Sequence, residues 1–204
     1  MILMEEEIVT LDNPIQIGEN LYGTEEDDNL GFAASLSDDG SRIALSELKS
    51  NLNGVRTGRI TVYENDGSSF TQVGNDIYGV DPSDQSGWSV SLSSQGDFLA
   101  FGTRGDDGLD NALKDVGSVK VYKFESDIWQ PVGSPIYGEY VGDASGETVS
   151  ISDDGLTVAI GAARNDEFAS DAGHVRIFRF DENNEWTQLG GDIDGDQIFN
   201  YTAS

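Results

Sequence analysis

A run of carboxylate and amide side chains, "RGDDGLDNALKDVG", follows one of three similar apolar segments of the chain. Calcium takes roughly six to eight oxygen ligands, and closely spaced Asp and Asn beside a flexible Gly commonly supply them. The pattern predicts calcium binding by this loop and by the matching loop later in the chain; the alternative is an acidic loop that is only solvated. The predicted ligands are Asp106, Asp107, Asp110, Asn111 and Asp115 in the first loop, and Asn165, Asp166 and Asp171 in the second.

Other chemistry has less support in the sequence. The chain has no cysteine, which excludes a thiolate nucleophile, a thiolate metal site and a disulfide framework. The single histidine, His174, opens a predicted strand where the other copies have Arg59 and Ser118, which favours an ordinary surface residue over a catalytic base. Carboxylates are abundant, but no pair stands out as the two that glycoside hydrolysis requires. The chain is therefore predicted not to be an enzyme.

The charge balance limits the possible partners. The chain carries 38 acidic and 11 basic residues, a net charge of −27. Nucleic acid and anionic membrane surfaces would be repelled, and no apolar run approaches the ~18 residues of a membrane span. We therefore expect no nucleic acid and no membrane insertion. An acidic surface suits calcium, a protein or glycan ligand, or copies of the same chain; solubility alone is the simpler explanation.

Internal repeats organise the whole chain. One motif occurs four times, as "QIGENLYG", "QVGNDIYG", "PVGSPIYG" and "QLGGDIDG". A second occurs three times, as "GFAASLSDDGSRIALS", "GWSVSLSSQGDFLAFG" and "GETVSISDDGLTVAIG", and each copy is followed by a third, as in "GHVRIFRFD". A single domain, 1–204, is predicted to hold repeats at about 15–70, 71–129 and 130–186, with a fourth beginning at 187–204.

Each repeat predicts four short strands, A to D. Apolar and small polar residues alternate in strand A, as in "SVSLS", and a turn such as Asp38-Asp39-Gly40 then leads to strand B. Strands C and D follow, and D ends at the glycine motif. The prediction is an all-β propeller of three four-stranded antiparallel blades plus a spare N-terminal outer strand. Because three blades leave sheet faces uncovered, we expect a piece of a longer propeller or assembly with other chains.

The repeat resembles two families of propeller. The phrase S-x-D-G-x-x-x-A-x-G, at Ser152 to Gly161, resembles the A–B hairpin of WD40-type propellers. The wider pattern, "WTQLGGDIDG" with "SVSLS", "VAIGA" and "GHVRIF", resembles the FG-GAP-like repeats of integrin-type propellers in microbial surface proteins. Integrin-type repeats bind calcium between strands A and B, but here that loop is shortened to Ser-Asp-Asp-Gly or Ser-Gln-Gly. Calcium is therefore expected to bind elsewhere or not at all.

This resemblance implies an extracellular or cell-surface location, although the stretch "MILMEEEIVT" is no signal peptide. In such a location, Asn200 in Asn-Tyr-Thr would be a glycosylation acceptor.

Strand direction places the D–A and B–C loops on one face, where acids outnumber basic residues. That face is the candidate site. The function predicted from it is a non-catalytic binding or scaffold module of a surface or secreted protein, acting through an acidic, calcium-binding loop face. The alternatives are a subunit that completes a propeller ring with copies or a partner chain, and a carboxylate-based glycoside-active enzyme.

Overall fold

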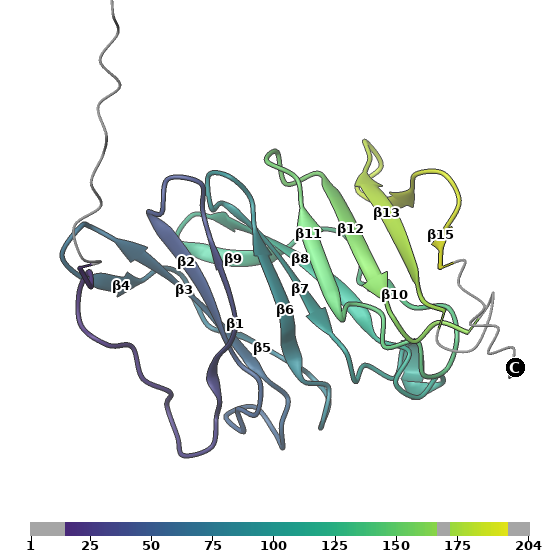
Figure 1. The fold of residues 1–204 in the computed structure, drawn as a ribbon, viewed down its shortest axis with the longest axis horizontal. Coiled ribbons are helices and arrows are strands. Elements are labelled where there is room, and N and C mark those ends of the chain that lie inside the picture. The colour runs from purple at the N-terminus through teal and green to yellow at the C-terminus, as the bar shows by residue number, and fades with distance from the viewer. Residues whose placement is uncertain (1–14, 167–171, 196–204) are drawn as a thin grey trace, which may run out of the picture.

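Three antiparallel sheets stand side by side along the molecule (Figure 1). A computed structural model describes residues 15–166 and 172–195 of the chain. Asp171 and Asn200, predicted as a calcium ligand and a glycosylation acceptor, lie outside these ranges. The all-β propeller-type fold with three blades is confirmed.

The first blade shows how the predicted strands are built. Its path runs from inner strand β1 through β2 to β3, and the expected outer strand is divided into β4 and β5, which both pair with β3. The division falls at Gly74, whose positive φ of 76° turns the chain between the two halves. The bounds are β1 Leu30–Leu36, β2 Arg42–Glu47, β3 Arg59–Asn65, β4 Phe70–Gln72 and β5 Ile77–Tyr78.

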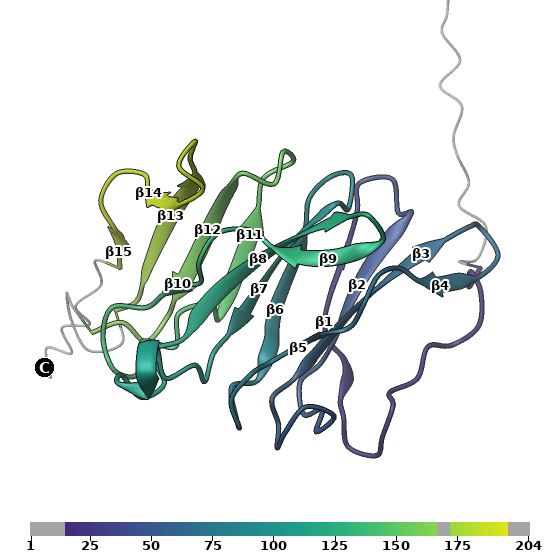
Figure 2. The same ribbon diagram turned by 180° about the vertical axis from the view of Figure 1, so that it is seen from behind.

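The other two blades repeat this plan, and the divided outer strands are in front in the reverse view (Figure 2). The second blade consists of β6 Ser86–Leu92, β7 Phe98–Thr103, β8 Ser118–Glu125, β9 Ile128–Pro131 and β10 Ile136–Tyr137. The third consists of β11 Thr148–Ile151, β12 Thr157–Ala162, β13 His174–Phe180, β14 Trp186–Gln188 and β15 Ile193–Asp194. In the described ranges, the only helical element is a 3-10 turn, Leu109–Asn111, which is too short to span a membrane.

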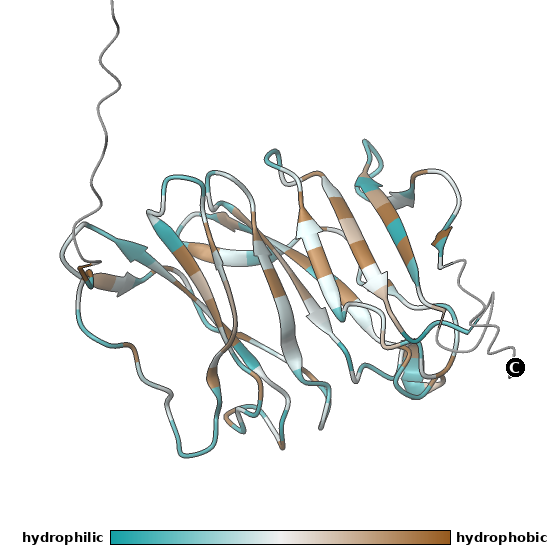
Figure 3. Ribbon diagram, in the orientation of Figure 1, coloured by the Kyte–Doolittle hydropathy of each residue, from teal (hydrophilic) through white to brown (hydrophobic). Residues whose placement is uncertain are grey.

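The core lies between blades rather than within them. One apolar cluster joins the first and second blades and another joins the second and third. Along the strands, hydrophobic residues alternate with more polar ones (Figure 3). At the outer edge, the indole of Trp129 donates to the carbonyl of Val73, 3.1 Å away, and Trp186 makes the matching bond to Val132 at 2.8 Å. A tryptophan of each later blade therefore fastens it to the glycine motif of the blade before.

The N-terminal copy of that motif lies against the first blade in a similar way. A Cβ at Gly18 would be 3.2 Å from the ring of Phe70, which occupies the place of Trp129 in its own blade. Described residues 15–29 have irregular and turn conformation and form no strand. The expected spare outer strand is thus represented by an irregular segment that packs on the first blade.

Candidate functional site

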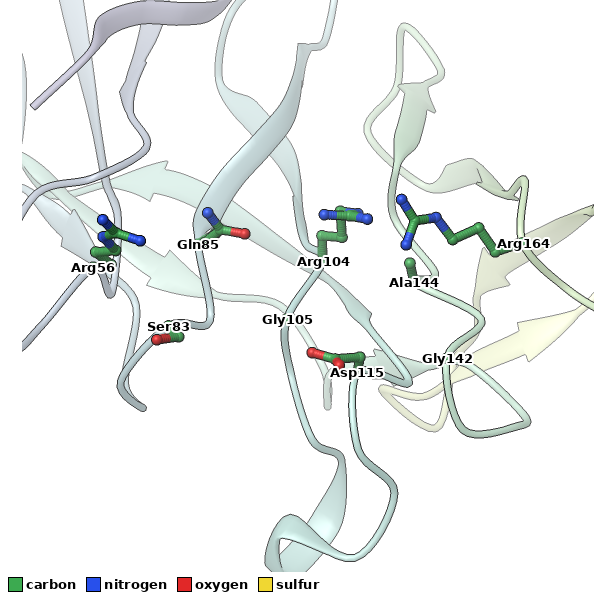
Figure 4. Close-up of a pocket in the computed structure, with 9 residues that line it drawn as sticks. All are labelled: Arg56, Ser83, Gln85, Arg104, Gly105, Asp115, Gly142, Ala144 and Arg164. Atoms are coloured by element: carbon green, nitrogen blue, oxygen red, sulfur yellow. The ribbon is translucent and has the colours of Figure 1, made fainter.

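A pocket of about 310 Å³ opens on the face formed by the D–A and B–C loops (Figure 4). B–C loops connect the second and third strands of a blade, and D–A loops connect one blade to the next. All three blades contribute to its wall, so the pocket requires the packed array. The lining residues are Arg56, Ser83, Gln85, Arg104, Gly105, Asp115, Gly142, Ala144 and Arg164. We call this the arginine pocket.

A single carboxylate holds two of the arginines together. The Nε atoms of Arg104 and Arg164 lie 2.9 and 3.4 Å from the same oxygen of Glu147. The guanidinium of Arg104 also lies 4.4 Å from the ring centroid of Trp88, a cation–π contact that fixes its orientation. In Figure 4 the guanidinium of Arg164 points toward Arg104. The pair therefore forms a positioned cationic surface rather than two free side chains.

The pocket has an excess of cationic groups although the chain has a net charge of −27. Its charged lining consists of three arginines and one carboxylate, that of Asp115, and Glu147 beside the lining offsets one more positive charge. Arginine favours planar, multiply hydrogen-bonded recognition of phosphate and carboxylate. The pocket lies on the same loop face that the sequence singles out for its acidic residues, and it adds a local group of cations to that face. Its arginines lie on three different loops at unmatched repeat positions, so no sequence signal identifies the pocket.

Some of the acids on this face point inward and shape the loops. Asp28, Asp84 and Asp143 occupy matching positions in the three D–A loops and are all buried. Each carboxylate accepts a hydrogen bond from a backbone N–H three residues earlier, at 2.8, 3.1 and 2.8 Å respectively. These carboxylates close the loop turns, so the number of acids in the sequence overstates the negative charge that a ligand would meet.

Asp84 gives this arrangement a pH dependence. Burial raises the pKa of its carboxyl to about 6, and the charge of Asp106 adds to the rise. The ordinary value is about 3.9, so the folded protein holds this proton more tightly than the unfolded chain. The resulting stabilisation is complete below about pH 4 and is lost as pH rises through about 6. Asp84→Asn should therefore be more stable, relative to wild type, at pH 7 than at pH 4.5.

Urea unfolding of both proteins from pH 4.5 to 7.5 measures this difference. Asp153→Asn, the same change at an exposed turn carboxylate, is the matched control. A curve for Asp84→Asn that stays parallel to wild type would contradict the prediction.

The predicted calcium ligands of the second-blade loop are partly engaged in protein contacts. Asp106 accepts from Gly108 N–H at 2.9 Å through one oxygen, and the other oxygen accepts from the Ser118 hydroxyl at 2.7 Å and lies 3.2 Å from the Lys120 ammonium. Asp107 accepts from the N–H of Asp115 at 2.8 Å. These contacts brace the loop from inside.

The remaining predicted calcium ligands are distributed over the B–C loops of the second and third blades. Asp110 and Asn111 lie on the exposed 3-10 turn, and Asp115 faces the arginine pocket. Asn165 is buried and donates to Asp143 at 3.2 Å, whereas Asp166 is exposed. Within residues 15–166 and 172–195, no three carboxylate or imidazole groups of the predicted set converge as metal ligands would. Calcium binding stays a prediction.

His174 corrects an expectation from the sequence. It was predicted to be an ordinary surface residue, but its side chain is completely buried at the start of β13. Arg59 and Ser118, at the same position in the other blades, are also buried. Glu139, from the loop before the third blade, and Asp192, from the glycine motif, lie against the imidazole, so a polar residue at the end of a strand can be enclosed by loops.

The fold matches solved β-propeller-type structures, while no family model and no curated protein matches the sequence. Two of the matched structures are candidate 6-phosphogluconolactonases, from Bacteroides uniformis and Bacteroides fragilis. Both are 16% identical to this chain, with TM-scores of 0.52 and 0.51. The alignments cover 79% and 80% of this chain but only 40% and 38% of the matched chains, about two fifths of their length. The likeness defines the class of this protein as a β-propeller-type fold.

These matches correct the functional prediction. The sequence favoured a non-catalytic module and predicted that the chain is no enzyme, whereas the matched propellers bear the name of an enzyme. The prediction followed from the absence of a recognisable catalytic set in the sequence. An active site assembled from loops of several blades leaves no such set in one segment.

Proposed function

We propose that this chain forms part of an enzyme active-site face that binds an anionic sugar derivative, with a sugar-phosphate lactone as the substrate class. The observation that carries the proposal is the convergence of Arg56, Arg104 and Arg164, one from each blade, on one pocket of an acidic chain. The candidate lactonase propellers support the choice of substrate class and reaction. The repeat type related to FG-GAP and an extracellular location remain predictions from the sequence.

The charges in the arginine pocket fit the hydrolysis of a lactone. Arg104 and Arg164 would hold the phosphate or stabilise the negative charge that develops on the carbonyl oxygen. Asp115 lines the same pocket and its side chain is 56% exposed, so it can contact water and act as general base. Water adds to the carbonyl carbon as Asp115 takes its proton. The ring C–O bond then breaks, and the proton passes to the leaving oxygen to give the hydroxy acid.

Binding is tested first, by calorimetry with 6-phosphogluconate, the stable product of such a reaction. Arg164→Gln should weaken binding at least about tenfold, because a charge-assisted contact contributes about 1.5–3 kcal/mol. Arg164 suits the test because its side chain is 55% exposed and its loss leaves no buried cavity. Arg179→Gln removes the same charge from an exposed position of β13 away from the pocket and should bind like wild type.

Catalysis is tested separately with Asp115→Asn. This variant should lose lactone hydrolysis above the spontaneous rate by about 100-fold or more. It should bind 6-phosphogluconate at least as tightly as wild type, because a negative charge has left the pocket. If wild type neither binds 6-phosphogluconate nor hydrolyses the lactone, the proposal is wrong. Equal loss of binding in Arg164→Gln and Arg179→Gln would place the ligand elsewhere.

A further inference from the structure

His174 lies at the centre of a cluster of potential metal ligands. Ligand atoms of Glu139, His174 and Asp192 all lie within 4.8 Å of one another. The Nδ1 atom of His174 is 3.2 Å from an oxygen of Asp192 and 3.9 Å from an oxygen of Glu139. We call these residues the histidine cluster. None of them lines the arginine pocket.

The imidazole is buried without a hydrogen bond. The His174 side chain is 0% exposed, and neither ring nitrogen makes a hydrogen bond, although Nδ1 lies within ion-pair distance of Asp192. A buried polar group without a partner costs free energy, and imidazole nitrogen is a common ligand for divalent transition metals. Its Nδ1 faces two carboxylates, so a cation between them would provide the missing partner. This observation is independent of the number of acids nearby.

In the first blade, the position that corresponds to His174 is occupied by a cationic side chain of the protein itself. Arg59 replaces His174 there, and its guanidinium lies 3.0 Å from Glu47 and 3.1 Å from Asp76. Asp76 corresponds to Asp192 in the glycine motif: Gln72 donates to Asp76 at 2.7 Å, and Gln188 donates to Asp192 at 2.6 Å. The third blade retains this Gln–Asp pair but has an imidazole in place of the guanidinium.

The surroundings would support a bound ion. One oxygen of Asp192 is held by Gln188 and the other faces His174, so the carboxylate is already oriented. One oxygen of Glu139 lies 3.5 Å from Arg176, and the other faces His174. Arg176 is itself fixed by donating to the Tyr137 carbonyl at 2.7 Å. Supporting contacts of this kind orient metal ligands and contribute to affinity. Glu139 is 36% exposed, which leaves a side open to solvent.

We propose that the histidine cluster binds one divalent transition-metal ion of the zinc class. A nitrogen and two carboxylate oxygens suit zinc and its neighbours, whereas calcium and magnesium prefer all-oxygen sites. Three protein ligands leave a position for solvent. The site does not depend on the proposed lactone chemistry, because it uses different residues.

The test is calorimetry and thermal unfolding of the full chain with Zn²⁺ alone in about 0.15 M salt, which screens weak attraction to exposed acids. Wild type should bind one ion tightly and unfold at a higher temperature with zinc. His174→Arg places a guanidinium beside Asp192, as Arg59 lies beside Asp76 in the first blade. It should lose zinc binding by at least about 100-fold, as loss of a ligand exceeds loss of a supporting group. Arg179→Gln should bind zinc like wild type.

A second variant guards against misfolding, and NMR identifies the ligand. Asp192→Asn keeps an oxygen to accept from Gln188 and should weaken zinc binding in the same direction. Because the chain has one histidine and no cysteine, zinc should shift a single set of imidazole resonances in wild type. The proposal is overturned if wild type binds zinc no more tightly than His174→Arg. It is also overturned if the imidazole resonances do not respond to zinc.

Discussion

Gly102→Ala is expected to lower the free energy of unfolding by about 3 kcal/mol or more, at the upper end of the cost of overpacking. Gly102 lies in β7 of the second blade, and a Cβ there would overlap the carbonyl oxygen of Gly146, which leads into the third blade. It would also lie 2.7 Å from the Ser89 hydroxyl, which donates to that same carbonyl at 2.8 Å. The two blades would have to separate, which would also loosen the core between them.

Thermal unfolding measures this effect. A loss of this size corresponds to a fall in Tm of roughly 6–12 °C for a domain of this length. Gly191→Ala is the matched control because a Cβ there meets open space and its φ lies outside the left-handed region. It should change stability by less than about 0.5 kcal/mol. If Gly102→Ala unfolds like Gly191→Ala, the second and third blades do not approach as closely at this point as the structure indicates.

The fold was predictable because repetition makes local signals consistent. Alternation marks strand A in each repeat, and the turn at Ser37 to Gly40 closes with a Gly40 N–H to Ser37 carbonyl bond of 2.9 Å. The turn after Ser152 closes identically, again at 2.9 Å. These features are local in sequence, so a single chain reveals them. The division of the outer strand into two short strands was missed because it depends on how the glycine motif packs against the tryptophan of the following blade.

The arginine pocket was not predictable from repeat positions. Arg104 is the first residue after β7, and the first residue after β12 is Ala163. Arg164 is the second residue after β12, and the second residue after β7 is Gly105. Aligned repeats therefore show no shared arginine. Glu147, from the loop before β11, pairs with both side chains and so links them. Such convergence across blades is a property of tertiary packing.

The grouping of the D–A and B–C loops on one face could be predicted, because strand direction alone decides which loops lie together. Which acids of this face are exposed could not be predicted, because an acid in a loop can turn inward, as Asp28, Asp84 and Asp143 do. The burial of His174 was missed for a related reason: loop residues distant in sequence, Glu139 and Asp192, lie against it in the folded chain. Sequence counts give the charge of a loop, but backbone hydrogen bonds and blade contacts decide which charges reach a ligand.

Arg59→Met should have the other large effect on stability, a loss of about 3–5 kcal/mol. The Arg59 guanidinium lies 3.0 Å from Glu47, whose side chain is only 2% exposed. Glu47 also accepts from the Thr24 hydroxyl at 3.2 Å, but no other cation pairs with it among the ion pairs of the described residues. Methionine keeps much of the apolar stem and removes the charge, so Glu47 would be left as a buried carboxylate without compensation.

A double-mutant cycle separates this electrostatic cause from a loss of packing. Glu47→Gln removes the negative charge and keeps a side chain that can bond to Thr24. Combined with Arg59→Met, it should recover part of the lost stability, so that the double variant is more stable than Arg59→Met alone in urea unfolding. Arg179→Met, at an exposed position, should stay within about 0.5 kcal/mol of wild type. If the double variant is no more stable than Arg59→Met, the buried charge of Glu47 is not what the guanidinium compensates. The loss would then come from packing around the arginine stem, and the first blade would no longer show what a cation does between two such carboxylates.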